Sequence, residues 1–183
     1  MTSMPPKLTV ATCSLAGCFG CHMSLLDLDE RLIPLLERVQ FDRSPINDIK
    51  HIRGLVDVGL VEGGVCNEEN VHVLREFRER CRLLVAVGEC GITGGIPSMR
   101  NAVGLQECLE ESYLRAVGVN SPHIPNDPEI PLLLDKVYPL HEVVKVDFSL
   151  PGCPPSADAF WHFLTRLLGG QDPALSGSLL RYD

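Results

Sequence analysis

The chain has 183 residues, enough for a substantial core, and we expect a single domain over residues 1–183. Hydrophobic residues make up 45% and charged residues 22%, a composition typical of folded chains. The formal net charge is −8 and no basic stripe occurs, which argues against a nucleic-acid partner. No export signal and no run of roughly 18 apolar residues occur, so we expect a cytoplasmic protein with no membrane partner.

Strands alternate with helices along the chain. The expected strands are residues 7–13, 55–61, 83–87 and 143–150, and the polar stretch 41–54 has room for another short one. The expected helices are residues 22–40, which Pro34 would kink or divide, 67–81, 97–109 and 155–168. This alternation predicts an α/β fold, a doubly wound, flavodoxin-like and mainly parallel sheet with helices on both faces.

Two stretches outside these elements have distinctive compositions. Residues 88–95 are rich in glycine and are expected to form a loop. Residues 110–140 contain Pro122, Pro125, Pro128, Pro131 and Pro139, which predict a mostly irregular surface excursion. Such a long excursion often serves a partner or a site.

The eight cysteines are many for a chain without an export signal, because a reducing cytosol disfavours structural disulfides. Cys18 and Cys21 form a C-x-x-C pair after the first expected strand, Cys90 follows the strand at 83–87, and Cys153 follows the last one. Because the carboxyl ends of parallel strands meet at one edge of the sheet, these four thiols are expected to converge. Four thiolates can hold a zinc ion or a cubane iron–sulfur cluster, and their wide separation in the sequence favours the cluster.

Glu62 follows a buried strand and enters the same edge. It is interpreted either as a solvated loop carboxylate or as a group beside the cluster, acting as hydrogen-bond acceptor, proton group or alternative ligand. Burial is expected to raise its pKa and keep it protonated or hydrogen-bonded while the cluster is reduced. His22 and His162 are expected to have hydrogen-bonding or surface roles, because the thiols already suffice as ligands.

The remaining four cysteines carry weaker signals. Cys81 and Cys108 are expected to be small buried hydrophobes in or at the end of helices, and Cys13 is expected to pack at the end of the first strand. Cys66, just past Gly63 and Gly64, is either a similar packing residue or a neighbour of the site.

Four segments carry a family resemblance: SLAGCFGCHMSLLDLDE, LVEGGV, VGECGITGG and LPGCPPSADAFW. Together and in this order they resemble the cluster-binding domain of [NiFe] hydrogenase small subunits and, more distantly, the cluster subunit of respiratory complex I. The resemblance implies that one [4Fe–4S] cluster is bound by Cys18, Cys21, Cys90 and Cys153.

Differences between the motifs of this chain and those of its relatives indicate which type of subunit it resembles most. The complex I subunit has adjacent cysteines in its first motif, whereas Phe19 and Gly20 separate the pair here, which disfavours a complex I-type subunit. Oxygen-tolerant membrane-bound hydrogenases add two cysteines at positions that look like Gly20 and Gly95, so an ordinary cubane is implied. Neither a second cluster domain nor a twin-arginine leader is expected, which is similar to small subunits of cytoplasmic NAD(P)-reducing hydrogenases.

The resemblance implies a division of labour among subunits. A large partner subunit would split H₂ at its nickel–iron centre, the cluster of this chain would accept electrons singly, and diaphorase iron–sulfur and flavin subunits would reduce NAD(P). The chain alone would have no hydrogenase activity. Two alternatives stay open: a zinc-stapled scaffold, and a flavin-binding electron carrier with FMN on this chain, which is disfavoured because Cys18 and Cys21 occupy the loop that would wrap the phosphate.

Overall fold

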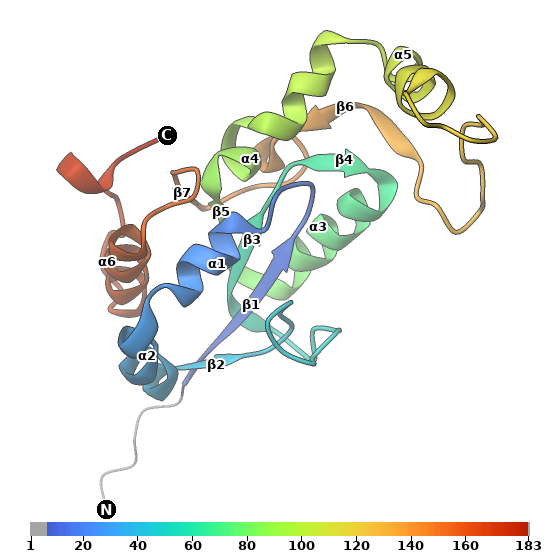
Figure 1. The fold of residues 1–183 in the computed structure, drawn as a ribbon. Coiled ribbons are helices and arrows are strands. Elements are labelled where there is room, and N and C mark those ends of the chain that lie inside the picture. Colours follow the sequence, from blue (N-terminus) through green and yellow to red (C-terminus); the bar gives the residue numbers. More distant parts are fainter. Residues whose placement is uncertain (1–6, 183) are drawn as a thin grey trace, which may run out of the picture.

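The computed structural model of the chain describes residues 7–182, and its central feature is a five-stranded parallel sheet (Figure 1). The strands are β1 (Leu8–Ser14), β2 (Val39–Phe41), β3 (Val56–Glu62), β5 (Cys81–Val87) and β7 (Phe148–Leu150). Their order is β2-β1-β3-β5-β7, so the strand order reverses between β1 and β3 as in flavodoxin. The predicted doubly wound α/β fold is confirmed.

Helices cover both faces of this sheet, and each face has its own hydrophobic core. The helices α1 (Gly20–Leu26), α2 (Leu32–Arg38) and α6 (Ala157–Leu168) cover one face, and α3 (Glu68–Arg80) covers the other (Figure 1). Along β1, Val10 packs with Phe160 in the first core, whereas Ala11 packs with Phe77 in the second. This alternation follows from the two-residue period of a strand, because successive side chains point to opposite faces.

The helix expected at residues 22–40 is divided into separate pieces. α1 ends at Leu26, the short 3₁₀-helix η1 (Asp29–Arg31) follows, and α2 begins at Leu32. Asp29, with φ +50°, marks the break, whereas Pro34 lies in the first turn of α2, where proline is tolerated. The expected division of this helix is therefore present, but at Asp29 instead of Pro34. The short second strand also exists, but β2 starts immediately after α2, inside the expected helix, and only Phe41 lies in the stretch 41–54.

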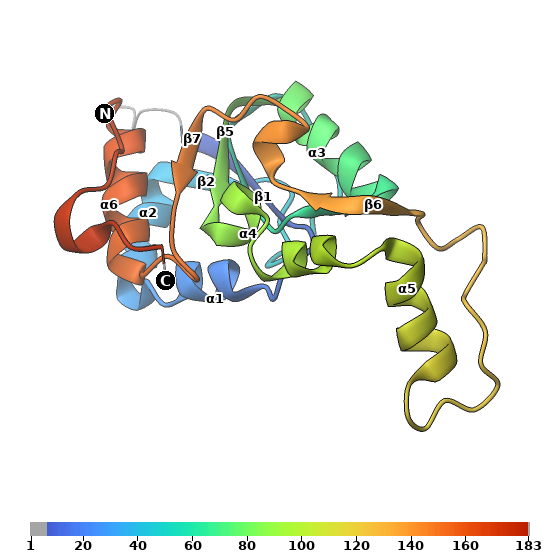
Figure 2. The same ribbon diagram turned by 90° about the horizontal axis from the view of Figure 1, so that it is seen from above.

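The segment from residue 88 to residue 142 is more ordered than its glycines and prolines suggested. It contains α4 (Gly88–Thr93), η2 (Ile96–Ala102), α5 (Leu105–Glu110), the π-helical turn η3 (Glu111–Arg115), β6 (Leu133–Tyr138) and η4 (Leu140–Glu142). The helix expected at 97–109 is interrupted at Val103 and Gly104. β6 pairs antiparallel with β4 (Val65–Asn67), and Figure 2 shows α5 and the loop after η3 projecting from the body.

The last expected strand is shorter than its apolar sequence suggested. Only Phe148–Leu150 joins the sheet, while Val143 and Val144 pack against the core under α3. After α6, a single 3₁₀ turn, η5 (Gly177–Leu179), is formed. Within residues 7–182, the helices are all too short or too polar to cross a membrane.

Candidate iron–sulfur site

The four predicted ligand cysteines lie on three loops at the carboxyl edge of the sheet. Cys18 lies between β1 and α1 with Cys21 in the first turn of α1, Cys90 lies in α4 directly after β5, and Cys153 lies between β7 and α6. Cys18 and Cys153 are exposed, whereas Cys21 and Cys90 are partly buried. The strand order therefore brings together residues that are far apart in the sequence, as the sheet topology predicted.

Backbone and side-chain hydrogen bonds hold these three loops to one another. The amide N–H of Glu89 donates to the carbonyl of Gly152 at 3.1 Å, and the N–H of Gly152 donates to the Glu89 carboxylate at 3.3 Å. The buried hydroxyl of Ser24 in α1 donates to the carbonyl of Pro155 at 2.5 Å. Each cysteine loop is thus fixed by the others rather than by solvent-exposed contacts.

The surroundings of Cys21 and Cys90, the two partly buried thiols, raise their pKa values and so disfavour their ionisation in the absence of a bound cation. Burial raises the pKa of Cys90, and negative charge on Cys153 and Cys18 raises it further. Burial also raises the pKa of Cys21, with further contributions from Glu62, Cys90 and Cys18. Positively charged iron would relieve this repulsion between thiolates.

The residues present fit an iron–sulfur cluster in donor chemistry. Thiolates are the usual ligands of such clusters, and Gly88 has no side chain that would collide with the sulfur of Cys21. Among residues 7–182, no three His, Cys, Asp or Glu side chains form a group that would hold a single metal ion.

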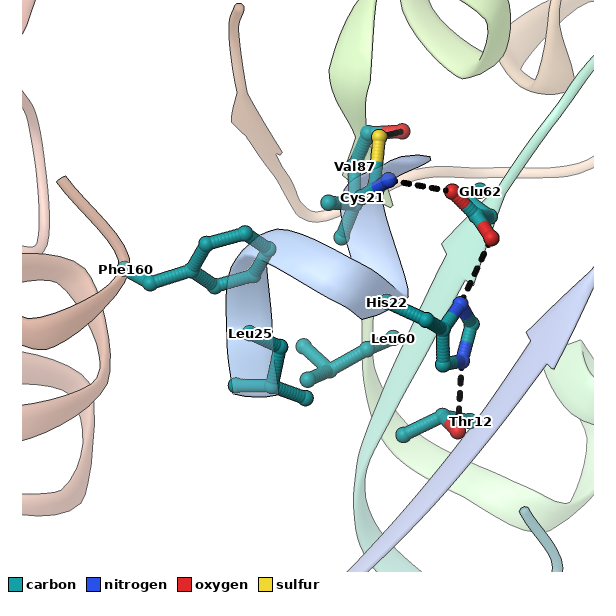
Figure 3. Close-up of a pocket in the computed structure, with 8 residues that line it drawn as sticks. All are labelled: Thr12, Cys21, His22, Leu25, Leu60, Glu62, Val87 and Phe160. Atoms are coloured by element: carbon teal, nitrogen blue, oxygen red, sulfur yellow. Dashed lines mark hydrogen bonds and ion pairs between the residues drawn. The ribbon is translucent and has the colours of Figure 1, made fainter. Parts of the chain in front are cut away.

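Glu62 is buried beside the cysteines and both of its carboxylate oxygens are occupied (Figure 3). Its Oε2 accepts a hydrogen bond from the amide N–H of Cys21 at 3.0 Å, and its Oε1 lies 2.6 Å from Nδ1 of His22. The interpretation of Glu62 as a solvated loop carboxylate was wrong, because the side chain is only 4% exposed.

The electrostatics of Glu62 also differ from expectation. Burial raises the pKa of its carboxyl, but hydrogen bonding and charge from His22 outweigh burial, with further donors from Cys21 and Ser14. The net effect holds the pKa of Glu62 below its usual range. The sequence did not predict the contribution of the histidine, whereas the expected hydrogen bonding of the carboxylate is present.

The sequence did not identify His22 as a partner of Glu62. Its ring is buried, and Nε2 lies 2.8 Å from Oγ1 of Thr12, which in turn lies 2.6 Å from Oγ of Ser44. Neither Thr12 nor Ser44 was predicted to belong to the site. A signal existed for Thr12, a polar residue inside an apolar strand, whereas Ser44 lies in a polar loop with no distinguishing pattern.

The other cysteines have mostly structural surroundings. Cys13 and Cys81 are buried in the core under α3, as expected, although Cys81 begins β5 instead of ending a helix. Cys108 in α5 is only partly buried. The thiol of Cys66 lies 3.3 Å from Oδ1 of Asn70 at the start of α3, which makes its contact one of local packing.

Comparisons with known proteins agree with this geometry. Residues 18–167 match the family described as NADH ubiquinone oxidoreductase, 20 Kd subunit. The chain is 48% identical to the NAD-reducing hydrogenase HoxS subunit delta of Cupriavidus necator, over 97% of this chain and 86% of that protein. A chain in a crystal structure of NAD+-reducing [NiFe]-hydrogenase in the H2-reduced state superposes with a TM-score of 0.94 at 52% identity, covering 97% of this chain and 100% of that one.

A more distant relative differs in length. One subunit of the F420-non-reducing hydrogenase of Methanothermobacter marburgensis is 36% identical over 97% of this chain, which spans 58% of that protein. The chain therefore belongs to the family of the NADH ubiquinone oxidoreductase 20 Kd subunit, whose members are cluster-binding electron-transfer subunits. Its similarity within the family is to subunits of NAD-reducing hydrogenases.

Proposed function

We propose that this chain is the electron-transfer small subunit of a cytoplasmic NAD(P)-reducing [NiFe] hydrogenase. In this proposal it takes electrons from H₂ oxidation at the nickel–iron centre of a large partner subunit and passes them towards diaphorase iron–sulfur and flavin subunits. The observation that carries the proposal is the gathering of four cysteines at one sheet edge, in a chain that is 48% identical to a subunit of an NAD-reducing hydrogenase.

We further propose that Cys18, Cys21, Cys90 and Cys153 are the ligands of one [4Fe–4S] cluster. Bound there, the cluster would supply one-electron redox chemistry at a potential set by its hydrogen bonds and its burial. The chain's own part is to provide four thiolates and to hold Glu62 beside Cys21. Glu62 is proposed as a neighbour of the cluster or an alternative ligand, because its carboxylate accepts a hydrogen bond from Cys21.

Serine replacement of single cysteines tests the ligand set. In the complex with its large subunit, Cys90→Ser or Cys153→Ser should lose or convert the cluster, lowering iron well below roughly four atoms per chain. Cys66→Ser is a matched control, because the Cys66 thiol contacts Asn70. Unchanged iron content and an unchanged visible spectrum in Cys90→Ser and Cys153→Ser would contradict the assignment.

The absorption of the anaerobically purified protein separates the alternatives. A cluster gives broad visible absorption that bleaches on reduction, whereas a flavin gives structured bands and zinc gives no colour. A flavin spectrum with no iron would favour the flavin-binding carrier, and a colourless protein containing zinc would favour the scaffold.

A further inference from the structure

Buried polar side chains form one continuous chain of hydrogen bonds that ends at the candidate cluster site (Figure 3). From the site inward, Glu62 contacts His22, His22 contacts Thr12, and Thr12 contacts Ser44, at 2.6, 2.8 and 2.6 Å between the bonded atoms. All four residues are almost fully buried. Burying a polar group costs free energy unless the group is hydrogen-bonded. Each of these four side chains has a hydrogen-bond partner.

These hydrogen bonds connect four separate parts of the fold. Thr12 belongs to β1, His22 to α1 and Glu62 to β3, while Ser44 lies in the loop after β2. β1 and β3 are the strands between which the sheet order reverses. The hydrogen bonds therefore tie the carboxylate to the interior of the sheet rather than to an exposed loop.

His22 also supports the backbone between the first two cysteines. The ring of Phe19 stacks on the His22 ring, with centroids 4.6 Å apart and an interplanar angle of 3°. Phe19 has φ +67°, a left-handed conformation that side chains other than glycine adopt at a cost. The face of the His22 ring thus contacts the C-x-x-C loop through Phe19, and a nitrogen at the edge of the ring contacts Glu62.

We infer that His22, supported by Thr12 and Ser44, is a positioning residue that sets the reduction potential of the cluster by holding the Glu62 carboxylate against the amide of Cys21. This inference rests on the proposed function, since it requires the cluster. A fixed carboxylate beside the site disfavours addition of an electron. An amide N–H that donates to the carboxylate is also withheld from sulfur, and both effects lower the potential.

The decisive experiment measures the midpoint potential of the cluster in the complex with its large subunit, by redox titration at fixed pH monitored by electron paramagnetic resonance. His22→Phe keeps a ring to stack on Phe19 but removes both hydrogen bonds, so the potential should shift to a more positive value. His22→Asn places an amide near the position of Nδ1 and should return the potential towards that of the wild type.

Thr12→Val tests the supporting link without touching the cysteine loop. It should shift the potential in the same direction as His22→Phe but by less, because the bond between His22 and Glu62 remains. Thr9→Val is a matched control on the same strand: it removes a 2.9 Å hydrogen bond to Asp57 at the opposite end of β1 and should leave the potential unchanged.

The outcomes separate this inference from the proposed function. Absence of any cluster in the wild-type complex would contradict the proposed function itself. A full cluster with the wild-type potential in both His22→Phe and Thr12→Val would overturn the inference and leave the proposed function standing. Equal shifts in Thr9→Val and Thr12→Val would also overturn it, because the effect would then be one of general stability.

Discussion

At the scale of single residues, Gly88 has the tightest surroundings of the candidate site. Its φ of +74° falls in the region that side chains rarely adopt, and the position of a Cβ atom there would collide with the sulfur of Cys21. The carbonyl of Gly152, on the Cys153 loop, lies 3.3 Å from the same position. A residue with a side chain would therefore push apart two of the loops that carry ligand cysteines.

We expect Gly88→Ala to reduce cluster content strongly, and Gly118→Ala to leave it unchanged. Gly118 has a similar φ of +86° but nothing within 4 Å of its Cβ position, so it carries the backbone strain without the collision. The strain alone costs about 1–2 kcal/mol. Iron per chain and visible absorbance of the purified complexes measure the difference, and equal losses in the two variants would show that strain alone is responsible.

The residue scale is also where sequence reasoning succeeded and failed most clearly. The gathering of Cys18, Cys21, Cys90 and Cys153 was predictable because parallel topology decides where strand ends meet. The contact of His22 with Glu62 was not predictable, since it joins residues 40 positions apart and depends on the rotation of α1 about its axis. The lowered pKa of Glu62 was missed for the same reason.

At the scale of elements, Arg78 of α3 joins three segments around the start of β5. It donates to the Asp147 carboxylate at 2.6 Å and to the carbonyl of Cys81 at 2.6 Å. Asp147, just before β7, also accepts the backbone N–H of Leu84 at 2.9 Å. Burial raises the pKa of Asp147, but the hydrogen bond from Arg78 and that from Leu84 outweigh it and hold the pKa below its usual range.

The ion pair between Arg78 and Asp147 predicts a pH-dependent contribution to the free energy of unfolding. A carboxyl whose pKa is lower in the folded state stabilises the fold above its unfolded pKa of about 3.9, and the contribution is lost as pH falls through the folded value. Arg78→Gln should lower the free energy of unfolding by about 1–2 kcal/mol at pH 7, because both side chains are only partly shielded from water.

Urea unfolding of the purified holoprotein at pH 7, and again below pH 4, measures this effect. The difference between Arg78→Gln and the wild type should shrink at the lower pH. Arg115→Gln is the matched control, because the pair of Arg115 with Glu110 is solvent-exposed and should contribute little. If Arg115→Gln lowered the free energy of unfolding as much as Arg78→Gln, the prediction for the Arg78–Asp147 pair would be contradicted.

The elements that the sequence predicted well are those with one continuous apolar pattern. β3, β5, α3 and α6 all lie within two residues of their expected bounds. The position of the break before α2 was missed because the helical spacing of apolar residues continues across the break. Leu25, Leu28 and Leu35, on either side of it, all pack in the same core. β2 and β7 have only three residues each, too few for a period to be read.

At the scale of the whole molecule, exposed apolar side chains gather on the segment that continues from the site. Ile96 and Met99 lie in η2, after the Cys90 helix, and Val117, Ile130 and Leu132 lie in the connection between η3 and β6. Figure 2 shows that this connection projects from the body before it returns to β6. Permanent interfaces are larger and more apolar than transient ones, and an electron relay must lie close to its donor. We therefore propose that the excursion at residues 110–140, together with the cluster edge and η2, contributes to the interface with the large subunit.

The proposed interface can be tested by comparing substitutions of two leucines that have nearly equal exposure. Leu132, directly before β6 at the end of the excursion, is 66% exposed, and Leu55, directly before β3 at the amino edge of the five-stranded sheet, is 69% exposed. Burying a leucine contributes about 1.5–3 kcal/mol and a buried unpaired carboxylate costs more, so Leu132→Glu should weaken binding of the large subunit at least about tenfold. Leu55→Glu introduces the same charge at an equally exposed site and should leave binding unchanged.

Co-purification of the large subunit with tagged variants, followed by titration of the affinity, measures both effects. Wild-type affinity in Leu132→Glu would contradict the proposed interface, and loss of binding in Leu55→Glu alone would move it to the amino edge of the sheet.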